Sequence, residues 1–262
     1  MQFRQWVDAL ETRHLADLTF PEVSRSLRAL SSTYVERRGR LGEGAALSGA
    51  GKRAAFALYY GPLHYLTVDH IVRTLPASHA PAPTLVDLGC GTGAAGSAWA
   101  AFSTPSPEII AIDRNQWALS EAAWTYRQFG LRARTRRDDL ARVRLPKSSA
   151  ALLAAFTLNE LPTDTRTELL RTLLDRAEAG DRVLIVEPIA RGVAPWWSEW
   201  VKRFEASGGR ADEWRFRVDL PPIVTKLDKA TGMDHRELTA RSLWASGSSG
   251  SGRSGGSGGS GG

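Results

Sequence analysis

One short segment, Leu85 to Gly93, constrains the fold of this chain more than any other. It reads Leu-Val-Asp-Leu-Gly-Cys-Gly-Thr-Gly and leads into a run of small residues that is typical of a helix. Glycine tolerates positive φ and carries no side chain that would keep a ligand away from the backbone. The segment therefore predicts a strand, a tight turn and a helix, with a nucleotide-like ligand at the carboxyl end of a parallel sheet.

The spacing of the glycines separates this turn from two other nucleotide-binding turns. Asp87 precedes Gly89, Gly91 and Gly93 in the pattern D-x-G-x-G-x-G. Dinucleotide-binding oxidoreductases carry G-x-G-x-x-G instead, and P-loop proteins carry a lysine that is missing here. Cys90 lies inside the turn, where a small apolar filler is expected more than a reactive thiol. The segment resembles motif I of the class I S-adenosylmethionine (SAM) methyltransferases.

Acidic residues follow two further strand-like segments. Residues 109–113 are apolar and end in Asp113, and a carboxylate at that place accepts ribose hydroxyls in doubly wound nucleotide-binding folds. Residues 131–137 predict a third strand, which is followed by Asp138 and Asp139. In the methyltransferase pattern, an acid after the third strand faces the adenine amino group.

Helical spacing fills the gaps between the predicted strands. Residues 150–158 and 181–188 predict a fourth and a fifth strand, and Gly180 is placed to end the helix between them. That helix has an apolar stripe of Leu169, Leu170, Leu173, Leu174 and Ala177. The helix after Asp113 is expected to carry Trp117, Glu121, Trp124 and Gln128 on one rim and to turn Ala118, Ala122 and Phe129 inward. Strands that alternate with helices predict an α/β fold, here the doubly wound, Rossmann-like class I methyltransferase sheet.

The chain divides into three parts by composition. Residues 1–83 show apolar residues at helical spacing and predict an amino-terminal helical cap over the SAM pocket. Residues 84–244 hold the strand–helix units of the SAM-binding domain. Residues 245–262 are almost entirely serine and glycine, which predicts a flexible tail that carries no chemistry.

Composition limits the class of protein. The chain has 262 residues, a single cysteine and a formal net charge of +6. One cysteine excludes an internal disulfide framework. No apolar run reaches the length of a membrane span, so we expect a protein of the cytoplasm without membrane contact. The positive charge indicates an anionic partner, and no group of residues has the spacing of a metal site.

The resemblance to class I methyltransferases implies a set of residues that bind SAM. Asp113 would lie beside the ribose, and the acids after the third strand beside the adenine. The set comprises Tyr60, Asp87, Gly89, Cys90, Gly91, Gly93, Asp113, Arg114, Asp138, Asp139 and Phe156.

Candidates for catalysis come from the end of the fourth strand and from the cap. Asn159 and Glu160 lie where methyltransferases place polar groups that face the substrate, and Glu160 is either a base or an anchor for a helix terminus. His64 would act as a base from the cap, although a single histidine is more often structural. Tyr59 is expected to pack the cap against the sheet, and Glu187 is either a pocket carboxylate or a structural one.

A finer resemblance rests on four segments in one order. They are Tyr-Tyr-Gly-Pro-Leu-His at 59–64, motif I, Leu-Asn-Glu-Leu-Pro at 158–162 and Val-Glu-Pro at 186–188. Together they are similar to the methyltransferase-like proteins associated with assembly of the small ribosomal subunit. Several members of that family carry extra cysteines thought to hold an iron–sulfur cluster, and this chain has none to spare.

Basic residues favour RNA as the substrate. One group lies on the third predicted strand and just beyond it: Arg132, Arg134, Arg136 and Arg137 on the strand and its end, and Arg142, Arg144 and Lys147 after it. A second group in the cap comprises Arg25, Arg28, Arg37, Arg38, Arg40, Lys52 and Arg53. We therefore expect a methyltransferase for RNA, with ribosomal RNA of the small subunit favoured. Two alternatives stay open: a methyltransferase for a small molecule beneath the cap, and a SAM-binding assembly factor without turnover.

Overall fold

The computed structural model describes residues 2–36, 47–75, 82–189, 194–233, 235 and 237–246. Two features predicted from the sequence lie outside these residues: the basic residues Arg37, Arg38 and Arg40, and the Ser/Gly tail from residue 247. Within the described part of the chain, no helix is long and apolar enough to cross a membrane.

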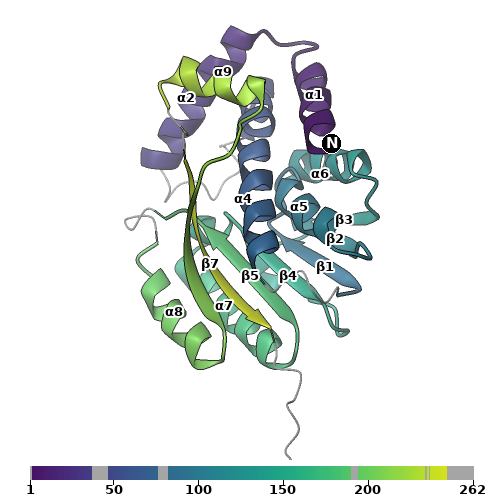
Figure 1. The fold of residues 1–262 in the computed structure, drawn as a ribbon, viewed down its shortest axis with the longest axis vertical. Coiled ribbons are helices and arrows are strands. Elements are labelled where there is room, and N and C mark those ends of the chain that lie inside the picture. Colours follow the sequence, from purple (N-terminus) through teal and green to yellow (C-terminus); the bar gives the residue numbers. More distant parts are fainter. Residues whose placement is uncertain are drawn as a thin grey trace, which may run out of the picture.

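A seven-stranded sheet with the order β3-β2-β1-β4-β5-β7-β6 forms the centre of the molecule (Figure 1). The five strands from β3 to β5 run parallel, whereas β7 runs antiparallel to both β5 and β6. This confirms the predicted α/β class and the Rossmann-like methyltransferase sheet. The strands are β1 (Thr84–Leu88), β2 (Glu108–Asp113), β3 (Ala133–Arg137), β4 (Ala151–Ala155), β5 (Arg182–Glu187), β6 (Arg210–Phe216) and β7 (Leu238–Ser246).

Helices cover both faces of the sheet, which explains why the central strands are apolar along their whole length. Leu85 of β1 belongs to the hydrophobic core on one face, and its neighbour Val86 belongs to the core on the other. The first face is covered by α4 (Gly61–Thr74), α5 (Ala94–Phe102) and α6 (Gln116–Gln128). The second face is covered by α7 (Thr163–Glu178) and α8 (Trp197–Ala206).

The amino-terminal helices lie above the carboxyl ends of the strands. They are α1 (Gln2–His14), α2 (Phe20–Glu36), α3 (Ala50–Ala55) and the π-helical turn η3 (Phe56–Tyr60), which runs directly into α4. The apolar spacing recognised in the sequence is the buried side of these helices: Leu10, Leu27 and Leu30 are fully buried. One core joins these residues to Leu85 of the sheet.

The carboxyl-terminal part of the chain joins the same layer. Helix α9 (Pro222–Thr231) lies beside α2 at the top of Figure 1, and Arg28 Nη1 donates a hydrogen bond to the carbonyl oxygen of Ala230 at 2.7 Å. The sequence analysis did not predict α8, α9, β6 or β7. Because α9 lies beside α2, helices from both ends of the chain surround the carboxyl ends of the strands.

Glu121 on α6 is a correction to the sequence prediction. It was expected on a rim with Trp117, but the structure buries it to 1% exposure. Its carboxylate lies 2.8 Å from His14 Nε2 and 3.4 Å from Arg13 Nε, both on α1. The period of α6 alone does not reveal that another helix covers this side, so only the tertiary packing decides the burial of Glu121.

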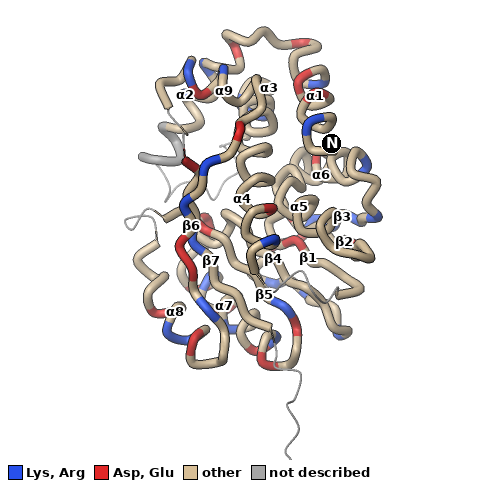
Figure 2. Tube along the Cα trace, in the orientation of Figure 1, with Lys and Arg blue, Asp and Glu red and all other residues tan. Residues whose placement is uncertain are grey.

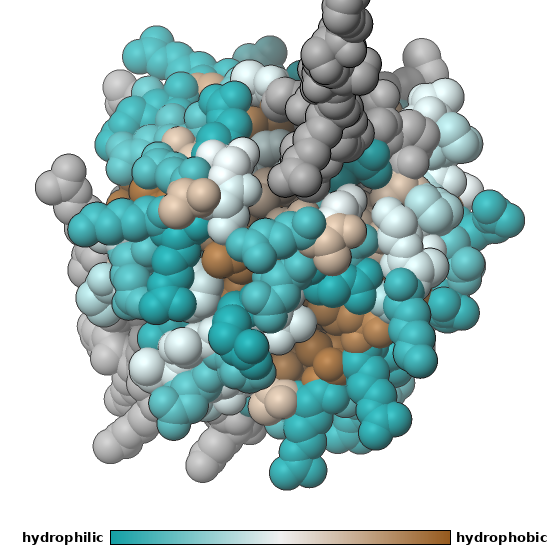
Figure 3. Space-filling view, turned by 90° about the horizontal axis from the view of Figure 1, so that it is seen from below, coloured by the Kyte–Doolittle hydropathy of each residue, from teal (hydrophilic) through white to brown (hydrophobic). Residues whose placement is uncertain are grey.

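Seen from the side away from α2 and α9, the surface is mainly hydrophilic with smaller hydrophobic areas between (Figure 3). Such a mixture is ordinary for a folded chain, because polar side chains cannot cover a whole surface. The opposite end of the sheet, at the carboxyl ends of its parallel strands, is the place where doubly wound folds bind ligands.

Candidate active site

A cavity of about 930 Å³ opens at the carboxyl ends of β1, β2 and β4, beneath the helical layer. This volume is at the upper end of the range for ligand pockets, roughly 300–1,000 Å³. Every residue predicted for the site except Gly93 lines it. The lining includes Tyr60, His64, Asp87, Gly89, Cys90, Gly91, Asp113, Arg114, Asp138, Asp139, Phe156, Asn159 and Glu160.

The glycine-rich loop follows β1 and is held by backbone hydrogen bonds to the end of β2. The amides of Gly89 and Cys90 both donate to the carbonyl oxygen of Ile112, at 2.8 and 2.9 Å. Gly89 and Gly93 have φ of +68° and +77°, and Gly93 is the left-handed residue from which α5 begins. Gly93 therefore fixes the conformation of the loop without lining the cavity. Cys90 is buried, and burial raises the pKa of its thiol well above the ordinary value.

The Gly89→Ala variant should be less stable than the Gly130→Ala variant. Both glycines have positive φ, +68° and +64°, so both substitutions carry the left-handed penalty of about 1–2 kcal/mol. A Cβ on Gly89 would also lie 2.3 Å from Thr157 Cγ2, whereas a Cβ on Gly130 would meet nothing within 4 Å. Chemical unfolding of the two variants checks this order, and equal losses of stability would contradict the tight fit of the loop against Thr157.

Asp87 is buried behind the loop and its carboxylate is engaged by the protein. Tyr126 donates a hydrogen bond to Asp87 Oδ2 at 2.9 Å. Burial raises the pKa of Asp87 to about 7, and the hydrogen bond from Tyr126 opposes this rise. A Cβ on Gly96 would lie 2.3 Å from the same Oδ2, so the first turn of α5 approaches the carboxylate closely. Asp87 therefore fixes the loop and α5, and its predicted contact with a cofactor stays a prediction.

Asp113 is the carboxylate best placed to bind a ribose. It ends β2 and lines the cavity. Its Oδ2 accepts a hydrogen bond from the amide of Gly91 at 3.0 Å, and its Oδ1 accepts one from the amide of Asn115 at 2.8 Å. Each carboxylate oxygen has a second lone pair, so two acceptor positions remain for vicinal hydroxyls. The same side chain thus joins the glycine-rich loop to the start of α6.

The two acids after β3 differ in their surroundings, although both line the cavity. Asp139 Oδ1 accepts a hydrogen bond from the amide of Ala141 at 3.0 Å and begins the short helix η5 (Leu140–Arg142). Asp138 Oδ2 lies 3.3 Å from Arg136 Nε. These positions are compatible with the predicted adenine contacts, which no further observation tests.

Aromatic rings from the helical layer and the end of β4 form one wall of the cavity. His64 of α4 stacks on Phe156, with ring centroids 4.1 Å apart and ring planes inclined by 13°. Phe56 and Tyr60, from the π-helical turn, lie 6.2 and 6.1 Å from His64. Burial lowers the pKa of His64 to about 4, so the imidazole is neutral at pH 7 and a weak base. The structure supports His64 as part of a wall more than as a catalytic base.

Phe156 departs from the strand that the sequence predicted for residues 150–158. Strand β4 ends at Ala155, and Phe156 has a φ of +57°, the only non-glycine residue with positive φ among those described. Residues 158–160 then form the short helix η6 (Leu158–Glu160). Backbone strain of this kind occurs where surrounding structure over-determines the conformation, and it is frequent at functional sites. Here it accompanies the stacking of the Phe156 ring against His64.

Asn159 is held by the protein through both ends of its amide. Its Nδ2 donates to Glu187 Oε2, and its Oδ1 accepts from Trp196 Nε1 at 3.1 Å. Glu187 also accepts from the amide of Leu158 at 2.8 Å, which anchors η6. Burial raises the pKa of Glu187 to about 8, against the lowering effect of these hydrogen bonds. The anchoring role weighed for Glu160 therefore belongs to Glu187, and Asn159 positions the turn.

Glu160 lines the cavity near Asp113 and Arg114. Burial, and next the negative charge of Asp113, raise its pKa to about 7, while Arg114 opposes the rise. Helix α7 begins at Thr163 after Pro162, and no side chain caps its amino terminus. A carboxylate with a pKa near neutrality is suited to accept a proton at physiological pH.

Several lining residues were not predicted from the sequence: Ser31, Leu47, Phe56, Thr157, Thr165 and Met233. They come from α2, the segment before α3, η3, the end of β4, α7 and the segment after α9. Phe56 lies three residues before the Tyr-Tyr-Gly-Pro segment recognised in the sequence, so it could have been predicted as a lining residue. Met233 carries no local signal, because only the packing of α9 on α2 brings it to the cavity. Among the described residues, no group of three His, Cys, Asp or Glu is arranged to hold a metal ion.

The cavity fits the cofactor that the sequence implies. A loop with little side-chain bulk lies next to a carboxylate with two open acceptor positions, as a nucleoside with a charged amino-acid tail requires. The family described as a methyltransferase domain matches residues 85–180, which include this loop, Asp113 and Glu160.

The fold is similar to that of solved methyltransferases. The mitomycin 7-O-methyltransferase MmcR superposes with a TM-score of 0.53 at 15% sequence identity, over 92% of this chain and 72% of that one. A putative O-methyltransferase from Nostoc punctiforme gives a TM-score of 0.53 at 15% identity, over 86% of this chain and 69% of that one. No curated protein sequence matches the chain. At these identities the likeness describes the fold alone.

Proposed function

We propose that this chain, a SAM-dependent methyltransferase, methylates a nucleobase of structured RNA. The observation that carries the proposal is an aromatic wall beside the cofactor cavity, whose rim continues into a basic strand edge. Single-stranded or extruded bases are bound in enzymes by stacking on aromatic side chains. The resemblance of residues 59–64, 158–162 and 186–188 makes ribosomal RNA of the small subunit the first substrate to test.

The basic edge consists of β3, which is the outermost strand of the parallel part of the sheet. Lys and Arg positions lie along this strand in Figure 2. Arg132, Arg134 and Arg137 are exposed, and Arg137 also lines the cavity. Arg134 has one ionic neighbour, Glu108, at 3.8 Å, a long distance for an exposed pair. Arg137 therefore places positive charge at the cavity, and Arg134 and Arg132, beside the start of β2, extend this charge along β3 toward its amino end.

Glu160 is the residue that would receive a proton from the acceptor. When bound, SAM supplies an electrophilic methyl group, so the protein mainly has to align a nucleophile with it. Glu160 lines the cavity, and its pKa of about 7 leaves a substantial fraction ionised at neutral pH. A nucleophile that carries a proton, such as an amine or a hydroxyl, would transfer it to this carboxylate.

The direct test is transfer of a labelled methyl group from SAM to RNA. Small-subunit ribosomal RNA, the assembled small subunit and a transfer RNA pool should be compared with an RNA-free metabolite extract. Label in the ribosomal RNA, lost in the Glu160→Gln variant, is the expected result. Label only in the metabolite extract would favour the second candidate function, and SAM binding without label anywhere would favour an assembly factor.

The second candidate is a methyltransferase for a small planar molecule. It is favoured by the cover that α2, η3 and the segment after α9 place over the aromatic part of the cavity, through Ser31, Tyr60 and Met233. Caps of this kind exclude water and restrict access to the site. RNA as the acceptor requires that a single base passes beneath this cover.

Charge reversal on the basic edge separates the two candidates. The Arg132→Glu, Arg134→Glu double variant should weaken RNA binding at least tenfold and reduce the slope of log affinity against log salt by about 1.4–1.8, since two phosphate contacts are removed. The matched control is Arg171→Glu with Arg203→Glu, which makes the same charge change on exposed positions of α7 and α8. If both double variants change the salt slope equally, β3 is not the RNA-binding edge.

A further inference from the structure

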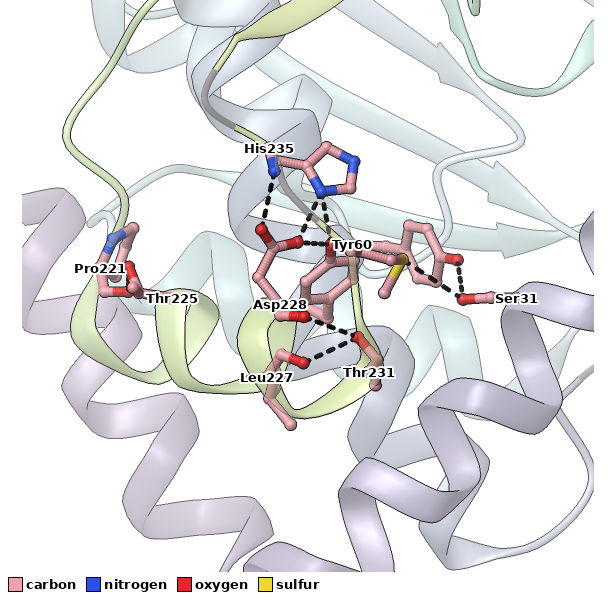
Figure 4. Close-up of polar contacts among 10 residues, drawn as sticks. Ser31, Tyr60, Pro221, Thr225, Leu227, Asp228, Thr231 and His235 are labelled. Carbon is pink, nitrogen blue, oxygen red and sulfur yellow. Dashed lines mark hydrogen bonds and ion pairs between the residues drawn. The ribbon is translucent and has the colours of Figure 1, made fainter.

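A buried hydrogen-bond network joins the π-helical turn to α9 and to the segment after it (Figure 4). Asp228 of α9 is 7% exposed and accepts a hydrogen bond from the hydroxyl of Tyr59, which is fully buried. The same carboxylate accepts from the amide of His235 at 2.7 Å and lies 2.6 Å from His235 Nδ1. Burial alone would raise the pKa of Asp228, but the hydrogen bonds from Tyr59 and His235 bring it below its ordinary value. The carboxylate is therefore ionised and bound from two sides.

The residues next to this network line the cavity. Tyr60 follows Tyr59 directly, and its hydroxyl lies 3.2 Å from Ser31 Oγ on α2. The sulfur of Met233, two residues before His235, lies 3.8 Å from Ser31 Oγ and 3.7 Å from the Tyr59 hydroxyl. Ser31, Tyr60 and Met233 all face the cavity. Three segments far apart in the sequence thus meet in one piece of its wall.

In the π-helical turn, the adjacent residues Tyr59 and Tyr60 contact different parts of the molecule. In an α-helix neighbouring residues point about 100° apart, and the wider π turn alters this local geometry. The rings of Tyr59 and Tyr60 lie 5.3 Å apart with planes inclined by 87°. One ring points toward α9 and its carboxylate, and the other joins Phe56 and His64 in the aromatic wall. Movement of Tyr59 would therefore displace Tyr60.

The network acts on the aromatic side of the cavity. Within the described part of the chain, the hydrogen bonds of the Asp228 carboxylate run to η3 and to the segment after α9, and the glycine-rich loop takes no part in them. Asp113, the carboxylate suited to the ribose, is held separately by Gly91 and Asn115. The hydrogen bonds that hold Asp228 and those that hold Asp113 are therefore separate, although Phe56 packs close to Gly91 of the loop.

We propose that Asp228 is a positioning residue that, through Tyr59 and His235, holds Tyr60 and Met233 as the wall that selects a planar ring as the methyl acceptor. This inference rests on the proposed function, because it takes the aromatic side of the cavity as the acceptor site. It assigns acceptor specificity to a carboxyl-terminal segment that lies outside the part of the chain matched by the methyltransferase domain.

The test uses Tyr59→Phe and Asp228→Asn in the full-length protein, with Tyr65→Phe as the matched control. Tyr65 is a buried tyrosine that stacks on Phe3 and Phe129 away from this network. With the RNA on which the wild-type protein acts as substrate, KM for RNA should rise about fivefold or more in the two variants. The affinity for S-adenosylhomocysteine and kcat should each stay within about twofold of the wild type. Equal losses of cofactor and acceptor affinity, or an unchanged KM, would overturn the proposal.

A second measurement keeps the inference separate from the identity of the substrate. The probe is 2-aminopurine riboside, whose fluorescence is quenched on stacking, added to protein saturated with S-adenosylhomocysteine. Saturable quenching by the wild type and by Tyr65→Phe, weakened at least fivefold in Tyr59→Phe and Asp228→Asn, is expected even if no RNA is methylated. Absent quenching by the wild type, or equal quenching by every folded variant, would overturn the assignment of this wall to a planar ring.

Discussion

Replacing Glu160 by glutamine is expected to lower kcat for methyl transfer by about 10²–10⁴-fold, the usual range for a general base. Glutamine keeps the size of the side chain but cannot accept the proton. Burial and the neighbouring Asp113 raise the pKa of Glu160 to about 7, so the wild-type rate should rise with pH up to about 7 and level off above it. The direction follows because the base works only when it is unprotonated. Steady-state rates of the wild type and the variant across this pH window check the prediction.

The control for this variant is Glu168→Gln, which changes an exposed glutamate of α7 whose partner is Arg171. It should leave both kcat and the pH profile unchanged. If Glu160→Gln keeps the wild-type rate and the same pH dependence, the acceptor needs no base. The carboxylate would then serve only to bind or orient it.

Asp113→Asn should weaken the binding of SAM by about 100-fold. The two hydrogen bonds that a carboxylate accepts from ribose hydroxyls are charge-assisted and are worth about 1.5–3 kcal/mol each, of which asparagine retains part. Asparagine is preferable to alanine because Asp113 also accepts hydrogen bonds from the amides of Gly91 and Asn115 on its two oxygens; asparagine keeps an acceptor for one of them, and alanine keeps neither. Calorimetric titration with S-adenosylhomocysteine measures the effect.

A matched control lies at the other end of the same strand. Glu108→Gln changes a half-exposed acid of β2 that pairs with Arg134, and it should leave the affinity unchanged. An unaltered affinity in a folded Asp113→Asn protein would show that this carboxylate does not contact the ribose.

Much of the sheet could be predicted from local sequence. The parallel strands are buried on both faces, so apolar runs such as Leu85–Val86 and Ile109–Ile112 mark them directly. The antiparallel strands could not be recognised in this way. Strand β6 is partly exposed, and charged residues lie on both sides of its one buried residue, Trp214. Its sequence therefore gives a much weaker hydrophobic pattern.

The cofactor half of the cavity could also be predicted, because each element there carries its residue at the carboxyl end of a strand. Asp87, Asp113 and Asp138 follow β-strand signals directly, and their order in the sheet follows from the fold. The opposite half depends on tertiary packing. Nothing local to Met233 or Asp228 indicates that α9 docks on α2, and the π-helical turn that separates Tyr59 from Tyr60 has no sequence signature.

The roles of the carboxylates were distinguishable only in the structure. Glu160 lies shortly after β4 and Glu187 ends β5. From the sequence, each could have either a structural or a chemical role. Hydrogen bonds from Leu158 and Asn159 occupy Glu187, whereas Glu160 lines the cavity near Asp113 and Arg114. Burial of Glu121 by α1 likewise depends on a contact between distant segments.

Binding of the cofactor to the cavity is measured most directly by calorimetric titration of the purified protein with S-adenosylhomocysteine and, separately, with SAM. The cavity at the ends of β1, β2 and β4 predicts saturable binding of one molecule per chain for both, weakened about 100-fold in Asp113→Asn. Absence of binding to a folded protein, or binding that Asp113→Asn leaves unchanged, would contradict the placement of the cofactor on which this account rests.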